Sequence, residues 1–169
     1  MRITAMLRES TPQSPDESQQ RRINAALAAY RPEFRLLRGF TYSLDEFTLL
    51  TSLTFPPYPF IVNQVPYVSV NLINISVEQA MLLHLDYEID MGYRFGRWSS
   101  IDAYRKEVDA GGWLVADLKT RVRQPVPNEA TLRLKTKIDK SRYLRSTYYI
   151  SFSASCLPHF TAKGLAVFP

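Results

Sequence analysis

Cysteine and histidine are both scarce in this 169-residue sequence, which contains one cysteine and two histidines. Cys156 has no second cysteine with which to form a disulfide within the chain, as is typical of proteins from a reducing compartment. His84 and His159 lie far apart, and Cys156 has no cysteine or histidine neighbour at metal-ligand spacing. We therefore expect no metal site and no cofactor.

Long apolar segments are also missing from the sequence. No run of about 18 apolar residues occurs, so no transmembrane helix is expected. The first seven residues are interrupted by Arg2 and followed by a polar stretch, so they lack the apolar core of a secretory signal. These absences favour a cytoplasmic protein, and the length and the 46% hydrophobic content fit a single globular domain.

Acidic residues are outnumbered by basic ones. The chain has 21 lysines and arginines against 16 aspartates and glutamates, which gives a net charge of +5. Such a balance favours an acidic partner, for which nucleic acid, the phosphates of coenzyme A and the acidic face of a carrier protein are candidates. A solvated basic surface without a partner explains the same charge.

The residues that are present predict a short tail followed by one domain. Residues 9–22 are rich in serine, proline and glutamine and almost devoid of apolar side chains, so residues 1–22 are expected to form a flexible tail. The domain, residues 23–169, opens with a short alanine-rich helix over residues 23–30, which Pro32 ends.

The next segments predict a β-hairpin followed by a buried helix. Apolar residues alternate over residues 34–42 and 47–55 on either side of a polar turn, which is typical of a hairpin. A helix is expected to begin at Ser76, whose capping box is completed by Gln79, and to run to about Met91. Because nearly all of its faces are apolar, this helix must be buried most of the way round.

The remainder of the chain predicts a short helix over residues 99–108 and four strands, at residues 113–122, 131–138, 143–155 and 160–168. A single helix wrapped by a curved antiparallel sheet explains why the central helix has no polar face. The sequence therefore predicts an α+β protein with the hot-dog fold.

Three motifs resemble the FcoT-type thioesterase family: RWSSIDAY at residues 97–104, RVRQPVPNEA at residues 121–130 and SVEQ at residues 76–79. The resemblance covers most of residues 30–169 and implies a hot-dog homodimer or larger oligomer with acyl sites between subunits. It implies one of two activities. Some members hydrolyse long-chain acyl-CoA. Others act in β-amino acid or isonitrile lipopeptide pathways, where they add glycine to a 2-enoyl chain on a carrier protein and release the N-carboxymethyl-3-amino acid.

The resemblance also implies site residues. Two tyrosines of the family match Tyr30 and Tyr67, and an amide near the helix start matches Asn74 if a one-residue gap is allowed, or Ile75 without it. A second amide of the family, midway along the helix, falls on His84. This departure indicates different chemistry at that position.

Residues near the expected helix start suit thioester hydrolysis. Free N–H groups at a helix N-terminus stabilise a developing oxyanion, so the thioester carbonyl is expected at residues 76–79. Tyr67 and Asn74 either orient the water and the carbonyl or only satisfy loop backbone groups. His84 is expected to be the general base, with a structural buried histidine as the alternative. Glu78 is the rival base, unless it only complements the helix dipole.

Substrate contacts are expected from residues on both sides of the central helix. Arg94 and Arg97 suit a glycine-derived carboxylate, although solvated surface arginines are an equal alternative. Tyr58 is expected to line an acyl tunnel, and Glu78 is expected to contact the substrate if it is not the base.

Basic side chains occupy alternate positions of two expected strands, where residues two apart share a face. If these strands pair, six cations form one patch that docks a carrier protein or the phosphates of coenzyme A: Lys119, Arg121, Arg123, Arg133, Lys135 and Lys137. A nucleic-acid footprint is the alternative, but no recognition helix or RNP-like aromatic motif supports it. We therefore expect neither a nucleic-acid nor a membrane partner.

These features together predict a thioester hydrolase that acts on an acyl group held by a carrier protein or coenzyme A. The resemblance implies a 3-(carboxymethylamino)acyl thioester, formed by glycine addition to a 2-enoyl thioester, as the substrate. A plain long-chain acyl-CoA thioesterase is the alternative. A dehydratase or hydratase is disfavoured because the loop before the helix has no histidine. A non-catalytic module that binds acyl groups or carrier proteins also remains open.

Overall fold

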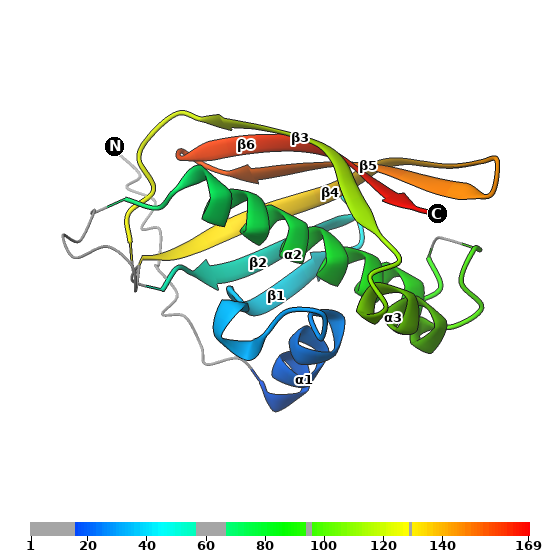
Figure 1. Ribbon diagram of the computed structural model, residues 1–169. Coiled ribbons are helices and arrows are strands. Elements are labelled where there is room, and N and C mark those ends of the chain that lie inside the picture. The colour runs from blue at the N-terminus through cyan, green and yellow to red at the C-terminus, as the bar shows by residue number, and fades with distance from the viewer. Residues whose placement is uncertain (1–15, 57–66, 94–95, 129) are drawn as a thin grey trace, which may run out of the picture.

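The computed structural model describes residues 16–56, 67–93, 96–128 and 130–169, which form one curved sheet with helices on one side of it (Figure 1). The elements, in chain order, are α1 (Glu17–Ala26), the 3₁₀ turn η1 (Pro32–Phe34), β1 (Leu37–Ser43), β2 (Thr48–Thr54), α2 (Val70–Asp90), α3 (Ile101–Asp109), β3 (Leu114–Val122), β4 (Thr131–Leu144), β5 (Thr147–Cys156) and β6 (Phe160–Phe168).

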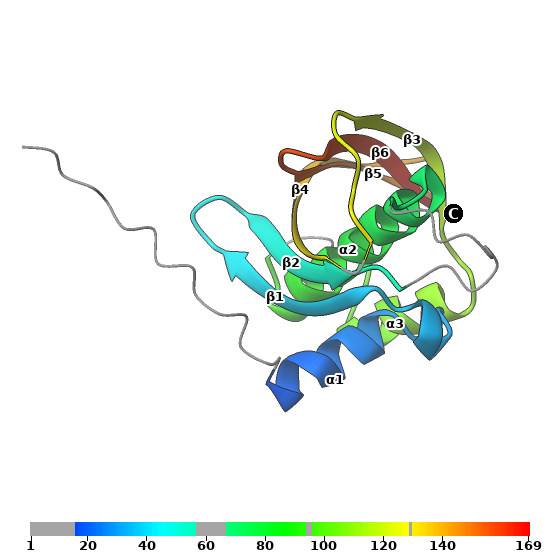
Figure 2. The same ribbon diagram turned by 90° about the vertical axis from the view of Figure 1, so that its left-hand side faces the viewer.

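The sheet has six strands in the order β1-β2-β4-β5-β6-β3, and every neighbouring pair is antiparallel. The chain therefore leaves the sheet after β2, passes through α2 and α3, and returns as the edge strand β3. Figure 2 shows the sheet curving around α2, with α1 below β1. Helix α1 contacts both β1 and α2, and α3 contacts α2. This arrangement is the hot-dog fold, as the sequence predicts.

The core forms where α2 meets the inner face of the sheet. Apolar residues on several sides of this helix are buried, including the consecutive Met81, Leu82 and Leu83. A helix that is apolar all round is stable only when other elements enclose it. Gln79 is a buried polar residue of this helix, and its hydrogen bonds are satisfied. Its side chain accepts from the Leu36 N–H at 2.9 Å and donates to the Phe34 carbonyl at 2.7 Å.

The expected start of the central helix at Ser76 is wrong. The helix begins at Val70, and its N-cap is Ser69, whose hydroxyl accepts from the Leu72 N–H at 3.4 Å. Ser76 is buried inside the helix, where its hydroxyl donates to the Ile73 carbonyl at 2.7 Å. Serine can bond back to its own helix in this way, so a serine followed by a glutamine is not by itself a helix start.

The expected first helix and the tail before it also need correction. Helix α1 begins at Glu17, because Asp16 caps it by accepting from the Ser18 N–H at 3.2 Å, and it ends at Ala26. Residues 17–22 are therefore helical rather than part of a flexible tail. Residues 1–15, the rest of that expected tail, lie outside the described residues.

The expected strands are confirmed, with shifts at their ends. β1 and β2 form the expected hairpin, β3 and β6 match the expected ranges closely, and β4 continues past residue 138 to Leu144. The turn into β5 falls at Arg145 and Ser146, which both have positive φ. β4 also contains a bulge between Ile138 and Lys140, so its alternation pattern stops before the strand does.

Gly164 in β6 is required by the packing of its cross-strand partner. A Cβ atom built on this residue would lie 2.3 Å from the ring of Phe152, its direct partner on β5. Gly164→Ala is therefore expected to lower the free energy of unfolding by about 1–3 kcal/mol, the usual cost of overpacking a core. Thermal and urea unfolding measure this change, with Gly96→Ala as the control, since a Cβ at Gly96 meets open space. An equal effect of both substitutions would contradict the packing argument.

Candidate functional site

Two polar side chains of α2, Asn74 and Glu78, lie one helical turn apart and project from the same side of the helix. The Glu78 carboxylate accepts a hydrogen bond from the Tyr30 hydroxyl at 3.4 Å. The Asn74 side-chain oxygen accepts from the Thr120 hydroxyl on β3 at 2.7 Å. The segment after α1, the central helix and the edge strand thus bring four half-buried polar residues together. We call Tyr30, Asn74, Glu78 and Thr120 the helix cluster.

The electrostatics of the helix cluster favour proton transfer at Glu78. Burial raises the pKa of the Glu78 carboxyl above its ordinary value of 4.5, and the hydrogen bond from Tyr30 offsets part of that rise. Burial and the neighbouring Glu78 carboxyl raise the pKa of Tyr30, so its hydroxyl stays protonated and donates. A carboxyl with a raised pKa in such a setting is the kind of group that serves as a general base or acid.

The expected place for the thioester carbonyl, at the N–H groups of residues 76–79, is wrong. These groups lie inside α2, where backbone N–H groups are bonded to carbonyls one turn earlier. Asn74 likewise belongs to the helix rather than to a loop before it. Tyr67 does precede the helix, where it is 51% exposed and forms an isolated antiparallel bridge with Pro127. The helix cluster and Tyr67 therefore do not form one contact network in the described residues.

His84 is fully buried in the core. Its Nδ1 atom lies 3.2 Å from the Thr136 hydroxyl on β4, and its Nε2 atom lies 3.2 Å from the Glu88 carboxylate. Tyr42 donates to the same carboxylate oxygen at 2.7 Å and meets the His84 ring edge-on, with centroids 5.6 Å apart. The expectation that this ring faces a substrate cavity is wrong, because its neighbours enclose it in a network of core hydrogen bonds.

Arg97 is not free to bind a substrate, because its guanidinium contacts the last residue of β6 and Glu107 of α3. Its guanidinium donates to the Glu107 carboxylate and to the Phe168 carbonyl, each at 2.6 Å, and lies 5.7 Å from the centre of the Trp98 ring. These contacts join α3 to the end of β6, so the expectation of a substrate carboxylate at Arg97 has no support in this geometry. Tyr58 and Arg94, the other expected substrate contacts, lie outside the described residues.

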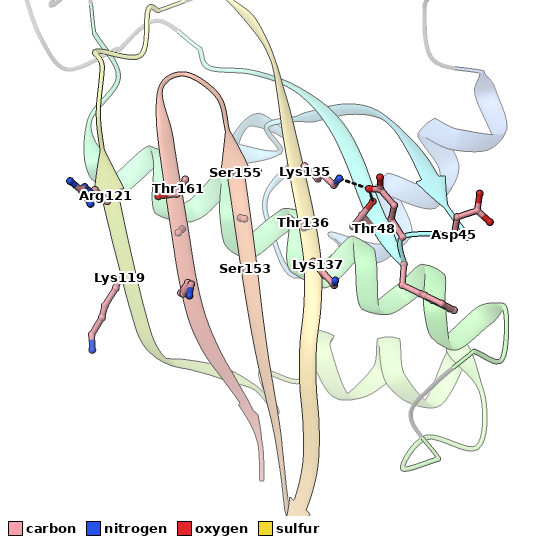
Figure 3. A pocket seen from close by; sticks show the side chains of 15 residues that line it. Asp45, Thr48, Lys119, Arg121, Lys135, Thr136, Lys137, Ser153, Ser155 and Thr161 are labelled. Atoms are coloured by element: carbon pink, nitrogen blue, oxygen red, sulfur yellow. Dashed lines mark hydrogen bonds and ion pairs between the residues drawn. The ribbon is translucent and has the colours of Figure 1, made fainter.

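The two basic strands do not pair, because β5 and β6 lie between β3 and β4. The expected patch of six cations on adjacent strands is therefore wrong in that form. Four of the six expected cations still lie together on the sheet face that points away from α2 (Figure 3). They line a hollow of about 960 Å³ together with Lys163, and the four are Lys119, Arg121, Lys135 and Lys137. We call it the outer hollow. Arg133 lies beside it, opposite Ser52, and Arg123 follows the end of β3.

Sequence reasoning missed two residues, Thr120 and Lys163. Thr120 lies between Lys119 and Arg121, and the alternation of a strand already places it on the opposite face from these cations. That signal was present in the sequence. Lys163 joins the outer hollow only because β6 lies next to β3, and strand order is not visible in a periodic pattern.

The described ranges, 16–56, 67–93, 96–128 and 130–169, also bear on metal and membrane sites. No cluster of three or more histidine, cysteine, aspartate or glutamate side chains is placed there to hold a metal ion. Among the helices of the same ranges, none is both long and apolar enough to cross a membrane.

No protein-family model matches this sequence, and no curated protein matches it. Three solved structures illustrate what the chain is similar to. The first is a thioesterase superfamily protein at 13% identity, with 78% of this chain and 55% of that protein covered and a TM-score of 0.46. The present chain thus spans about half the length of that protein.

The second is the PaaI protein of the phenylacetic acid degradation operon of E. coli, at 8% identity, with 77% of this chain and 78% of that one covered and a TM-score of 0.45. The third is a sigma28-regulated virulence protein of Campylobacter jejuni, at 7% identity, with 94% and 96% covered and a TM-score of 0.49. At such identities and TM-scores, the three likenesses indicate nothing about the activity of this chain.

Proposed function

We propose that this chain hydrolyses an acyl thioester and that Glu78 is the general base. The observation that carries the proposal is a half-buried carboxyl of raised pKa on the enclosed helix, hydrogen-bonded to Tyr30 and one turn from Asn74. Attack of water on a thioester requires a base that takes a proton from the water and a donor that stabilises the carbonyl oxygen. The carboxyl of Glu78 and the amide of Asn74 can supply these two groups.

The reaction assigns one role to each member of the helix cluster. Ionised Glu78 removes a proton from water as the water oxygen attacks the thioester carbon, and Tyr30 holds the carboxylate in place. Thr120 fixes the side-chain oxygen of Asn74, which turns its N–H₂ group away from Thr120 and toward the carbonyl oxygen that gains charge. The carbon–sulfur bond then breaks, the carboxylic acid leaves, and the thiolate takes up the proton.

The acyl group is proposed from the motifs that resemble FcoT-type thioesterases, not from the geometry. We expect a 3-(carboxymethylamino)acyl thioester as the first candidate and a long-chain acyl-CoA as the second. The contacts of Arg97 with Glu107 weigh against that arginine as the partner of the glycine-derived carboxylate. We also expect a homo-oligomer, as that resemblance implies, and a cytoplasmic protein, as the absence of long apolar segments favours.

A panel of thioesters tests the proposal directly. Purified protein is incubated with saturated acyl, 2-enoyl and 3-(carboxymethylamino)acyl thioesters of coenzyme A and cysteamine, with and without glycine, and release of free thiol is followed. Hydrolysis of at least one thioester, saturable in substrate, is the expected result. Product analysis by mass spectrometry separates hydrolysis from glycine addition. No turnover of any member of the panel would contradict a hydrolase and leave a binding module.

A further inference from the structure

The outer hollow is lined by residues of the strands and of the turn between β1 and β2, and no helix of the described residues contributes to it. Figure 2 shows α2 on the opposite, inner side of the curved sheet. Five cations and two carboxylates, Asp45 and Glu46, line this hollow, so its lining is strongly basic. At one side of the hollow, Glu46 forms an ion pair with Lys135 on β4. Toward the other side lie Lys119 and Arg121 on β3 and Lys163 on β6.

The register of the strands arranges these cations in two rows across the sheet. One row crosses β4, β5, β6 and β3 and consists of Lys137, Ser153, Lys163 and Lys119. The next row consists of Lys135, Ser155, Thr161 and Arg121. Figure 3 shows the small hydroxyl residues between the cations, with α2 behind the sheet. The hollow therefore has basic walls on β4 and β3, and between them β5 and β6 carry Ser153, Ser155, Thr161 and the fifth cation, Lys163.

Lys119 and Lys163 lie directly opposite each other on neighbouring strands. Like charges in directly opposed positions oppose sheet formation. Lys119 has a carboxylate nearby, but its ammonium is 3.7 Å from Asp117 and the pair is largely exposed, so little of the repulsion is offset. A bound anion would offset it, and a pair that disfavours the free fold while favouring an anionic complex is evidence for such a ligand.

The dimensions and lining favour an acidic protein surface as the occupant. The walls are three strand spacings apart, about 14 Å, which matches the diameter of about 10–12 Å of an α-helix with its side chains. Between the walls, Ser153, Ser155 and Thr161 offer hydroxyl groups that can donate to carboxylates. Single-stranded nucleic acid is held by successive aromatic side chains, and of the lining residues Phe47 alone is aromatic.

The outer hollow and the helix cluster meet at β3. Lys119 and Arg121 point to the outer face, while Thr120 between them points inward and donates to Asn74. A partner seated in the hollow would thus lie one strand away from the residues that we assign to hydrolysis.

We propose that the outer hollow docks an acidic helix of the protein that carries the acyl thioester. This inference rests on the proposed hydrolase activity for the identity of the partner. The charge and shape of the outer hollow are independent of that activity.

Binding without turnover tests the docking. The probe is an acidic acyl carrier protein with a bare pantetheine arm, titrated into the parent and into the double variant Lys119→Gln, Lys163→Gln. Loss of two of the five lining cations is expected to raise Kd about tenfold or more and to flatten its dependence on salt between about 50 and about 200 mM. The melting temperature of the double variant should equal or exceed that of the parent, because the opposed like charges are gone.

The matched control is Arg38→Gln with Lys106→Gln, which removes the same charge from exposed positions on β1 and α3, outside the hollow. Its Kd should stay within about twofold of the parent value. An equal rise in both double variants would overturn the proposal in favour of a general charge effect. Binding of a single-stranded oligonucleotide or of free coenzyme A more tightly than the carrier protein, with loss in the hollow variant, would also overturn it.

Hydrolysis is scored separately, so that the two proposals can fail independently. Carrier binding that depends on Lys119 and Lys163, without hydrolysis of any thioester, would contradict the hydrolase and keep the docking surface. If the protein hydrolyses acyl-cysteamine but binds no carrier protein, the docking proposal fails and the hydrolase remains. If the protein both hydrolyses thioesters and docks the carrier protein, the Lys119→Gln, Lys163→Gln variant should lose kcat/KM unequally. The loss should be at least about fivefold larger for carrier-bound substrate than for acyl-cysteamine.

Discussion

Glu78→Gln is expected to lower kcat for thioester hydrolysis by about 10²–10⁴, the usual cost of losing a general base. Glutamine keeps the shape of the side chain and can still accept a hydrogen bond from Tyr30, but it cannot take a proton from water. Steady-state kinetics on the best thioester of the panel measures the change, and KM should move much less than kcat. Glu33→Gln, which alters an exposed carboxyl in η1, is the matched control and should leave kcat within about twofold.

The pH dependence of kcat gives the assignment a second readout. Because burial raises the pKa of Glu78, the rate should rise with pH along an acid limb that lies above the ordinary value of 4.5. The hydrogen bond from Tyr30 lowers that pKa, so Tyr30→Phe should move the limb to higher pH. An acid limb that persists in Glu78→Gln would assign it to another group and remove Glu78 from the mechanism.

Stability should change in the opposite direction from activity. A carboxyl whose pKa is raised in the folded state stabilises the fold below its ordinary pKa, and this stability is lost as pH rises through the folded value. Glutamine mimics the protonated form, so Glu78→Gln should unfold at a higher temperature than the parent at pH 8. The difference should vanish below about pH 4.5, where the parent carboxyl is protonated in both states.

The fold was predictable because its signals are periodic. Alternation over residues 34–42 and 47–55 and the apolar faces of α2 fix a hairpin and an enclosed helix, and both are present. Helix ends were harder, because a capping signal is short and recurs by chance. Ser69 and Ser76 both offer a hydroxyl, and the local sequence does not show that Leu72, Ile73 and Ile75 between them pack into the core as part of the helix.

The candidate site depended on contacts that no local pattern contains. Tyr30 and Glu78 are far apart in the sequence and meet because the segment after α1 passes alongside α2. Sequence spacing ranked His84 above Glu78, since a histidine suits proton transfer near neutral pH. The spacing could not show that Thr136, Glu88 and Tyr42 enclose the histidine ring.

His84→Ala is therefore expected to act on stability rather than on chemistry. The substitution opens a cavity in a closed core and removes a hydrogen-bond partner from Thr136 and from the buried Glu88 carboxylate. Losses of these kinds together lower the free energy of unfolding by about 3–5 kcal/mol. For a domain of this size that corresponds to a melting temperature lower by roughly 6–20 °C.

Two comparisons separate a core histidine from a catalytic one. His159→Ala removes a half-exposed ring whose Nδ1 lies 2.9 Å from the Pro125 carbonyl, and it should cost less than about 1 kcal/mol. His84→Gln keeps an amide that can reach Thr136 or Glu88, so it should recover part of the stability lost in His84→Ala. Measured well below its melting temperature and corrected for the folded fraction, kcat of His84→Gln should stay within about threefold of the parent. A fall of about 10² or more in kcat at an unchanged melting temperature would instead make His84 the base and remove that role from Glu78.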